Sequence, residues 1–157
     1  DYGDIEPEAY AHATLGCAQD LDDVAGATEK SYTPSEKMKA LIRARDGHCR
    51  FPGCCVPASK CQVDHIIPWA EGGPTAAWNL QLLCQRHHNM KTDGRFTADA
   101  NGLAEIRWIG PMDVPAVTRP TGPLVKAMPR GIWGQVLRDR IQARFERIRD
   151  RALNKED

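Results

Sequence analysis

The chain has 157 residues, and its 21 basic residues balance its 21 acidic residues. Its hydrophobic content of 41% and charged content of 27% are ordinary for a globular protein, and no apolar run approaches the roughly 18 residues that a membrane span needs. These values argue against a membrane protein and favour one domain with its own core, or a small motif domain with helical flanks.

The net charge of zero hides a strong segregation of charge along the chain. Residues 1–30 carry eight acidic residues and one lysine, whereas residues 119–151 carry nine basic residues and three acidic ones. Nucleic acids are bound mainly through clustered lysines and arginines, because these neutralise backbone phosphates. The C-terminal part is therefore the electrostatic candidate for a DNA-binding surface.

The first well-marked element is a helix that follows an acidic linker. The run Thr33-Pro34-Ser35-Glu36 predicts a helix start with Thr33 as the N-cap and Glu36 completing a capping box. The helix should extend from Pro34 to Arg45, because apolar residues recur there with helical spacing. Asp46-Gly47 supplies the stop signal.

The middle of the chain predicts the order strand, loop, strand, helix. The first strand covers Gln62–Ile67 and is followed by a turn over Glu71–Thr75 that contains two glycines and a proline. A second strand covers Trp78–Leu83, and a short helix covers Gln85–Lys91. The preceding residues 48–61 have no apolar period, so a bound ion would have to provide their order.

A hairpin and a tether are expected next. Gly94–Ile109 should form the hairpin, with its turn at Asn101-Gly102. Residues 110–130 are rich in proline and should be extended and irregular.

The longest predicted helix lies at the C-terminus, over residues 131–153. Apolar residues recur there every three or four positions, and the other faces are rich in arginine. The apolar stripe could pack on the domain or pair with a second copy in a homodimer. Arg144 and Arg147, on the other faces, could contact DNA.

Two close pairs of soft ligands predict a structural zinc site. Cys49 and Cys54 form one pair, and Cys84 and His87 form the other, as a tetrahedral zinc site requires. Disulfides are the alternative for a chain with six cysteines, but they would leave the histidine unused. Cys55 or Cys61 could replace one of the chosen ligands. A zinc site implies reduced thiols and hence a cytoplasmic protein.

A second, harder set of side chains suits phosphodiester hydrolysis, which needs a base for water and a divalent cation for the phosphate. The candidates are Asp64, His65, Asn79 and His88. Asp64 offers the carboxylate that Mg²⁺ prefers, and a histidine nitrogen suits Mn²⁺ and similar ions. Adjacent helical residues point about 100° apart, so His87 should face the zinc and His88 the other site.

The joint pattern resembles the HNH endonucleases, also called ββα-metal nucleases, and among them the zinc-braced branch. The residues that carry the resemblance are Asp64-His65-Ile66, Pro68, Gly72-Gly73, Thr75, Asn79-Leu80, Leu83-Cys84, His87-His88 and Lys91, framed by Cys49 and Cys54. The resemblance covers roughly residues 45–95.

The resemblance implies a role for each matching residue. His65 would be the general base, and Asp64 and His88 would hold a catalytic cation such as Mg²⁺ or Mn²⁺. Asn79 would orient the base through its backbone or join the metal shell, and Lys91 with Arg86 would contact phosphate. The implied reaction is DNA cleavage that leaves 5′-phosphate and 3′-hydroxyl ends. A zinc-dependent nucleic-acid-binding module without cleavage is the alternative.

The expected fold is α+β, a small zinc-stapled ββα-metal core with flanking helices and a C-terminal amphipathic helix. The expected segments are an acidic linker with a short helix (1–32), the nuclease core with its leading helix (33–95), the hairpin and proline-rich tether (96–130), and the basic amphipathic helix (131–157).

Overall fold

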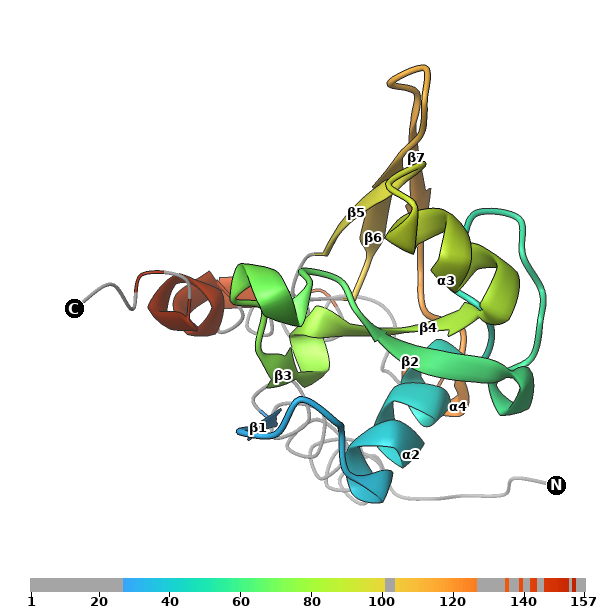
Figure 1. Cartoon of the computed structure of the whole chain (residues 1–157). Helices are drawn as coiled ribbons and strands as arrows, with labels where there is room; N and C mark the ends of the chain where they lie inside the picture. The colour runs from blue at the N-terminus through green and yellow to red at the C-terminus, as the bar shows by residue number, and fades with distance from the viewer. Residues whose placement is uncertain are drawn as a thin grey trace, which may run out of the picture.

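The computed structural model describes residues 27–100, 104–126, 135, 139, 142–143, 146–152 and 154. Its helices and strands are, in chain order, β1 (Thr28–Glu29), α2 (Glu36–Asp46), β2 (Cys61–His65), β3 (Thr75–Ala76), β4 (Leu80–Cys84), α3 (Gln85–Thr92), β5 (Thr97–Ala100), β6 (Ile106–Ile109), β7 (Pro115–Thr118) and α4 (Pro123–Lys126). The strands pair as β1-β3, β2-β4 and β5-β6-β7. In Figure 1, α2 lies below the β2-β4 pair and the three-stranded sheet stands above it.

The ββα core has the predicted order. β2 pairs antiparallel with β4, with Cys61 opposite Cys84 and His65 opposite Leu80. β4 is buried along its whole length, and α3 follows it without a loop. The predicted α+β fold with a ββα core is therefore confirmed.

One hydrophobic core joins the ββα unit to its neighbours. Its buried side chains come from α2, β2, β4, β5 and β6, and include Met38, Ile42, Leu82, Ile106 and Trp108. Because β4 is buried on both faces, a one-residue shift of this strand would move every side chain to the opposite, differently packed face, including the polar Gln81.

The N-cap of α2 is Ser35, and the prediction of Thr33 was wrong. The Ser35 hydroxyl accepts a hydrogen bond from the Met38 backbone N–H at 3.1 Å. The Ser35 N–H donates to the Glu29 carboxylate at 2.7 Å, and the Ser35 hydroxyl donates to the same carboxylate. Glu29, brought close by the chain before the helix, thus does what the sequence assigned to Glu36 in the capping box.

The predicted irregular tether over residues 110–130 is also corrected. Within it, Pro115–Thr118 forms β7, which pairs with β6 through Ile106↔Thr118 and Ile109↔Pro115. A proline is tolerated there because it begins an edge strand, where its missing N–H costs no ladder bond. The pairing of β5 with β6 confirms the predicted hairpin, whose expected turn at Asn101-Gly102 lies outside the described residues.

The C-terminal helix is described only in part. Residues 146–152 are helical, and Ile148 and Ala152 pack against the buried Ala76 and Trp78. At these positions the apolar stripe packs on the domain. Pairing with a second copy stays a prediction. Within the described residues, no helix combines the length and the apolar character needed to span a bilayer.

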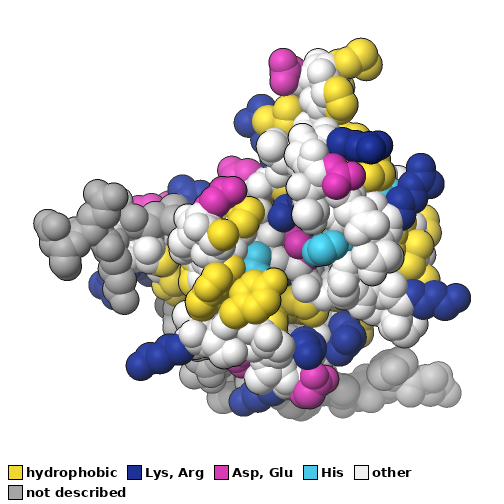
Figure 2. Space-filling view, in the orientation of Figure 1, with side chains coloured by type: hydrophobic (Ala, Val, Ile, Leu, Met, Phe, Trp, Pro, Cys, Tyr) yellow, Lys and Arg dark blue, Asp and Glu magenta, His cyan; other side chains and the backbone are white. Residues whose placement is uncertain are grey.

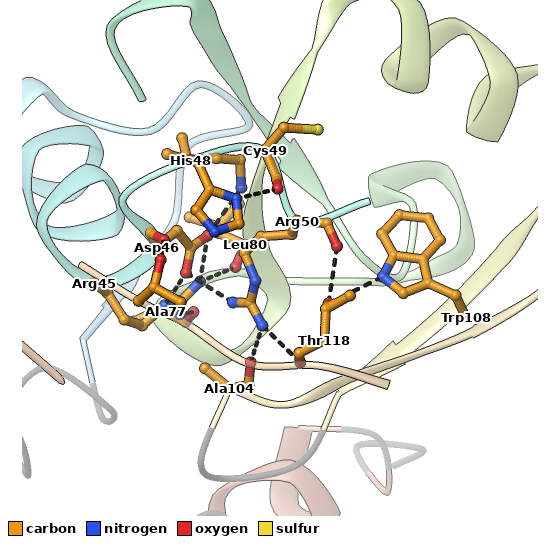
Figure 3. A network of polar contacts seen from close by, with 12 residues as sticks. Arg45, Asp46, His48, Cys49, Arg50, Ala77, Leu80, Ala104, Trp108 and Thr118 are labelled. Atoms are coloured by element: carbon orange, nitrogen blue, oxygen red, sulfur yellow. Dashed lines mark hydrogen bonds and ion pairs between the residues drawn. The ribbon is translucent and has the colours of Figure 1, made fainter. Parts of the chain in front are cut away.

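A buried charge network ties α2 to β4 and β7 (Figure 3). The Asp46 carboxylate, 0% exposed, accepts hydrogen bonds from Arg45 Nε at 2.7 Å, Arg50 Nη1 at 2.9 Å and the Leu82 N–H at 3.0 Å. Arg50 Nη2 donates to the Thr118 carbonyl oxygen at 3.0 Å. Each guanidinium also donates to backbone carbonyl oxygens of other segments, so one carboxylate connects three parts of the fold.

Replacing Asp46 by Asn should destabilise the protein by about 3 kcal/mol, because it leaves two buried guanidinium groups without a compensating anion. Urea unfolding followed by circular dichroism measures this change. The control is Asp93→Asn, whose carboxylate is 57% exposed in its 3.8 Å ion pair with Arg95. Its removal should cost less than about 0.5 kcal/mol. Equal effects of the two substitutions would contradict a structural role for the network.

Candidate metal cluster and active site

Four soft ligands meet at the junction of β4 and α3. The ligand atoms of Cys49, Cys54, Cys84 and His87 all lie within 4.8 Å of one another. His87 Nδ1 is 3.3 Å from Cys84 Sγ and 3.5 Å from Cys49 Sγ. Adjacent ligands of a tetrahedral zinc ion lie roughly 3.5–3.8 Å apart, given its bond lengths. The four residues predicted from the sequence therefore form a cluster that could hold a zinc ion.

Local structure explains why these residues meet. Between Cys49 and Cys54 the chain turns at Gly53, whose φ of 73° favours glycine, and the Cys54 N–H donates to the Phe51 carbonyl oxygen at 3.1 Å. Cys84 ends β4, and His87 is three residues further on, in the first turn of α3. The Phe51 ring stacks on the His87 imidazole at 3.9 Å and 11°. The turn and the helix are therefore packed together beside the cluster.

The remaining described cysteines lie outside the cluster. Cys55 is exposed, and the buried Cys61 thiol donates to the Val56 carbonyl oxygen at 3.4 Å. The five described cysteines are all free thiols. Of the alternatives that the sequence left open, the structure brings Cys54 rather than Cys55 or Cys61 to the other three ligands.

Burial controls the thiols of the cluster. Burial raises the pKa of the Cys49 thiol to about 12. Burial also opposes ionisation of Cys84, but hydrogen bonds from the His87 backbone N–H and from the Cys49 and Cys54 side chains outweigh it and lower the pKa of this thiol. A metal ion must displace these protons when it binds, so its affinity should fall as the pH falls.

Asp64 and His88 form a second, harder pair of candidate ligands. Asp64 Oδ1 lies 3.5 Å from His88 Nε2, which is long for a hydrogen bond. Two adjacent ligands of one octahedral ion lie about 3 Å apart, so a cation fits between these atoms better than a shared proton does. The His88 Nδ1 atom is buried without a hydrogen-bond partner among the described residues.

Two further side chains hold the other oxygen of Asp64. Gln81, which lies opposite Asp64 in the β2-β4 register, donates to Oδ2 at 3.0 Å. Lys91 Nζ lies 3.1 Å from the same oxygen and donates to the His65 carbonyl oxygen at 2.7 Å. Oδ1 is thereby left facing His88.

His65 lies at the end of β2 in a partly aromatic setting. Its Nε2 is 2.9 Å from the Thr75 hydroxyl. The Tyr32 ring stacks on the imidazole at 5.5 Å, and Trp69 meets it edge-on at 6.0 Å. Burial lowers the pKa of His65, the nearby Lys91 also lowers it, and Asp64 opposes them. The imidazole is thus favoured in its neutral form, which can accept a proton.

The Asn79 side chain fixes the loop that follows His65. It is fully buried, its Oδ1 accepts from the Ile67 N–H at 2.8 Å, and its Nδ2 donates to the carbonyl oxygens of Ile67 at 3.0 Å and Pro74 at 2.9 Å. A Cβ at Gly73 would lie 2.0 Å from the Ile67 carbonyl oxygen, so the loop requires glycine there. Of the roles implied for Asn79, these contacts are those of a positioning residue.

The predicted phosphate contacts lie in different settings. Lys91 is brought to the site, but its side chain is only 11% exposed and contacts Asp64 and His65. Arg86, on α3, and Arg147, on the C-terminal helix, are exposed. Arg144 lies outside the described residues. In Figure 2, histidine, acidic and basic side chains gather in a hollow beside α3, with apolar side chains along one rim.

The sequence did not indicate Gln81, Thr75 or Tyr32 as parts of the site. Thr75 belonged to the matched motif without an assigned role, and Gln81 could be placed opposite Asp64 only with the strand register known. Tyr32 lies in a segment that carried no signal beyond its aromatic ring.

Comparison with known proteins agrees with this geometry. Residues 47–94 match the family model described as HNH endonuclease. This segment contains the four ligands of the cluster, the β2-β4 pair and α3. Residues 47–94 thus match an HNH endonuclease domain, which covers about a third of the chain.

Two mycobacterial proteins each match less than half of this chain. The uncharacterized protein Rv2100 of Mycobacterium tuberculosis is 50% identical over 66 residues, which cover 42% of this chain and 12% of that protein. The uncharacterized protein Rv3776 of the same species is 46% identical over 65 residues, or 41% of this chain and 12% of that protein. The chain thus spans only a small part of these proteins.

A solved structure also matches, at low similarity. The Type IV phosphorothioation-dependent restriction endonuclease ScoMcrA covers 98% of this chain with 24% of its own length. The TM-score is 0.28 and the sequence identity 19%. A TM-score this low does not define a shared fold.

Proposed function

We propose that this chain is a metal-dependent DNA endonuclease that hydrolyses phosphodiester bonds. The observation that carries the proposal is the Asp64–His88 pair, 3.5 Å apart. Asp64 lies on β2 next to His65, and His88 lies on α3 next to His87 of the Cys/His cluster. A divalent cation such as Mg²⁺ or Mn²⁺ between these two residues would neutralise charge on the scissile phosphate and the leaving oxygen.

The residues of the chain supply the proton transfer and the positioning. Neutral His65 takes a proton from a water molecule, and the resulting hydroxide attacks phosphorus. The bond from phosphorus to the 3′ oxygen breaks, that oxygen takes a proton from solvent, and the products carry 5′-phosphate and 3′-hydroxyl ends. Asn79 and Gly73 keep the loop after His65 in place, and Gln81 with Lys91 orients the Asp64 carboxylate.

The proposed role of the Cys/His cluster is a structural zinc site. α3 has eight residues and none of them is buried, so hydrophobic packing contributes little to holding it. Cys84 and His87 would hold a zinc ion at the first turn of α3, and the anchored helix would then place His88 opposite Asp64.

His65→Ala should lower the rate of DNA cleavage by about 10²–10⁴-fold, the usual contribution of a general base. Supercoiled plasmid with Mg²⁺ or Mn²⁺ is the substrate, and zinc content with circular dichroism is the control for folding. A variant that keeps its zinc and cuts as fast as the parent would refute the assignment. DNA binding without cleavage by the parent would favour the binding module instead.

Cys54→Ser should release zinc and destabilise the middle of the chain, whereas its neighbour Cys55→Ser should do neither, because Cys55 is exposed and outside the cluster. Zinc content is measured by atomic emission and structure by circular dichroism. Loss of zinc with unchanged unfolding behaviour would contradict a structural role.

The basic C-terminal helix is proposed to bind the DNA backbone. Neutralising Arg144 and Arg147 should weaken DNA binding for all sequences and reduce the slope of log affinity against log salt by about 2. The control is Lys60→Ala, directly before β2 and at the far end of that strand from His65, which should leave the slope near that of the parent. An unchanged slope in the double variant would show that the helix does not contact DNA.

A further inference from the structure

A buried hydroxyl connects the candidate base to a segment upstream of the HNH domain. Thr75 is 0% exposed, and its Oγ1 lies 2.9 Å from His65 Nε2. The same oxygen donates to the Tyr32 carbonyl oxygen at 3.2 Å. Thr75 is therefore the middle member of a chain of three groups that ends on the imidazole.

The direction of these hydrogen bonds follows from the atoms involved. In the hydrogen bond between Thr75 and Tyr32, the hydroxyl donates its single proton, because a carbonyl oxygen can only accept. The Thr75 oxygen can then only accept from His65, and the proton of a neutral imidazole must lie on Nε2. The other ring nitrogen, Nδ1, is left with its lone pair free.

We propose that the Thr75 hydroxyl and the Tyr32 carbonyl select the Nε2–H tautomer of His65 and so make Nδ1 the nitrogen that accepts the proton. Thr75 is thus a positioning residue that acts through His65. This assignment rests on the proposed function for its catalytic consequence, but the tautomer itself is a property of the ring.

Backbone pairing holds this chain of hydrogen bonds in place. β1 pairs with β3 with Glu29 opposite Thr75, and the Ala77 N–H donates to the Ala27 carbonyl oxygen at 2.9 Å. These bonds fasten the segment that carries the Tyr32 carbonyl beside β3. The β2-β4 pair independently holds His65 in place. Two different sheets therefore position the two ends of this chain of hydrogen bonds.

Aromatic contacts restrict the rotation of the imidazole. The Tyr32 ring lies nearly parallel to it, at an angle of 7°, and the Trp69 ring approaches at 68°. A flipped ring would lose the contact of Nε2 with Thr75, and the rotation toward it would pass through orientations that break the stacked pair. Residues 27–35 therefore contribute to the site although they precede the matched residues 47–94.

The test compares Thr75→Val, which keeps the shape but removes the hydroxyl, with Thr75→Ser, which keeps the hydroxyl. Nitrogen-15 NMR of labelled histidine distinguishes the two tautomers of His65, and plasmid cleavage gives kcat and KM separately. Thr97→Val, on the exposed part of β5, is the control for a threonine to valine change.

The parent and Thr75→Ser should show the Nε2–H tautomer at neutral pH. Thr75→Val should show a mixture, with kcat lowered about 10–100-fold and KM little changed, as for loss of an orienting partner. If Thr75→Val unfolds partly through loss of its buried hydroxyl, the spectra of the parent and of Thr75→Ser still decide the tautomer.

Two results would overturn the proposal that Thr75 and the Tyr32 carbonyl select the tautomer of His65. One is the Nδ1–H tautomer in the parent, and the other is a folded Thr75→Val variant with parental kcat and an unchanged tautomer. A parent that shows the Nε2–H tautomer but does not cleave DNA would refute the proposed function and support this selection of the tautomer, so the two failures are distinguishable.

Discussion

The candidate site depends on one constraint, the direct junction of β4 with α3. Because no loop intervenes, Cys84 ends the strand and His87 and His88 follow on the first turn of the helix. Adjacent residues on a helix point about 100° apart, so one histidine meets the cysteines and the next meets Asp64. The short helix has no buried residue of its own. The contacts at its ends must therefore hold this helix in position. We expect disruption of the Cys/His cluster to displace His88 from Asp64 as well.

A second constraint lies behind the first. β4 is held on its other side by the Asp46 carboxylate, which accepts from the Leu82 N–H, and by Arg45, which donates to the Leu80 carbonyl oxygen at 2.6 Å. Burying these charges is costly, and they are tolerated because each is paired and hydrogen-bonded. The network orders the chain between α2 and the cysteine turn, so it helps to position Cys49 of the Cys/His cluster without contacting the candidate site.

The sequence predicted the parts of the site that depend on local spacing. Cys84 and His87 are candidate ligands only three residues apart, so their spacing is visible in the sequence. The order of the two strands and the helix follows from the apolar runs, and it too could be predicted without knowledge of the tertiary structure. Strand register and long-range contacts, which no local pattern encodes, determine the remaining features. These are the proposed role of Thr75, the position of Gln81 and the network around Asp46. The local pattern favours Thr33 as the N-cap. It cannot show that Glu29, from an earlier segment, accepts the Ser35 N–H and so supports Ser35 in that position. The sequence did not predict β7 because proline usually interrupts a strand. Proline is permitted as the first residue of a strand at the edge of a sheet, as Pro115 is here.

The central claim is that one helix serves two different metal sites, and anomalous X-ray scattering from crystals grown with zinc and Mn²⁺ tests it most directly. The account predicts a zinc peak among Cys49, Cys54, Cys84 and His87, and a separate manganese peak between Asp64 Oδ1 and His88 Nε2. A single metal peak, or manganese bound away from Asp64 and His88, would contradict it.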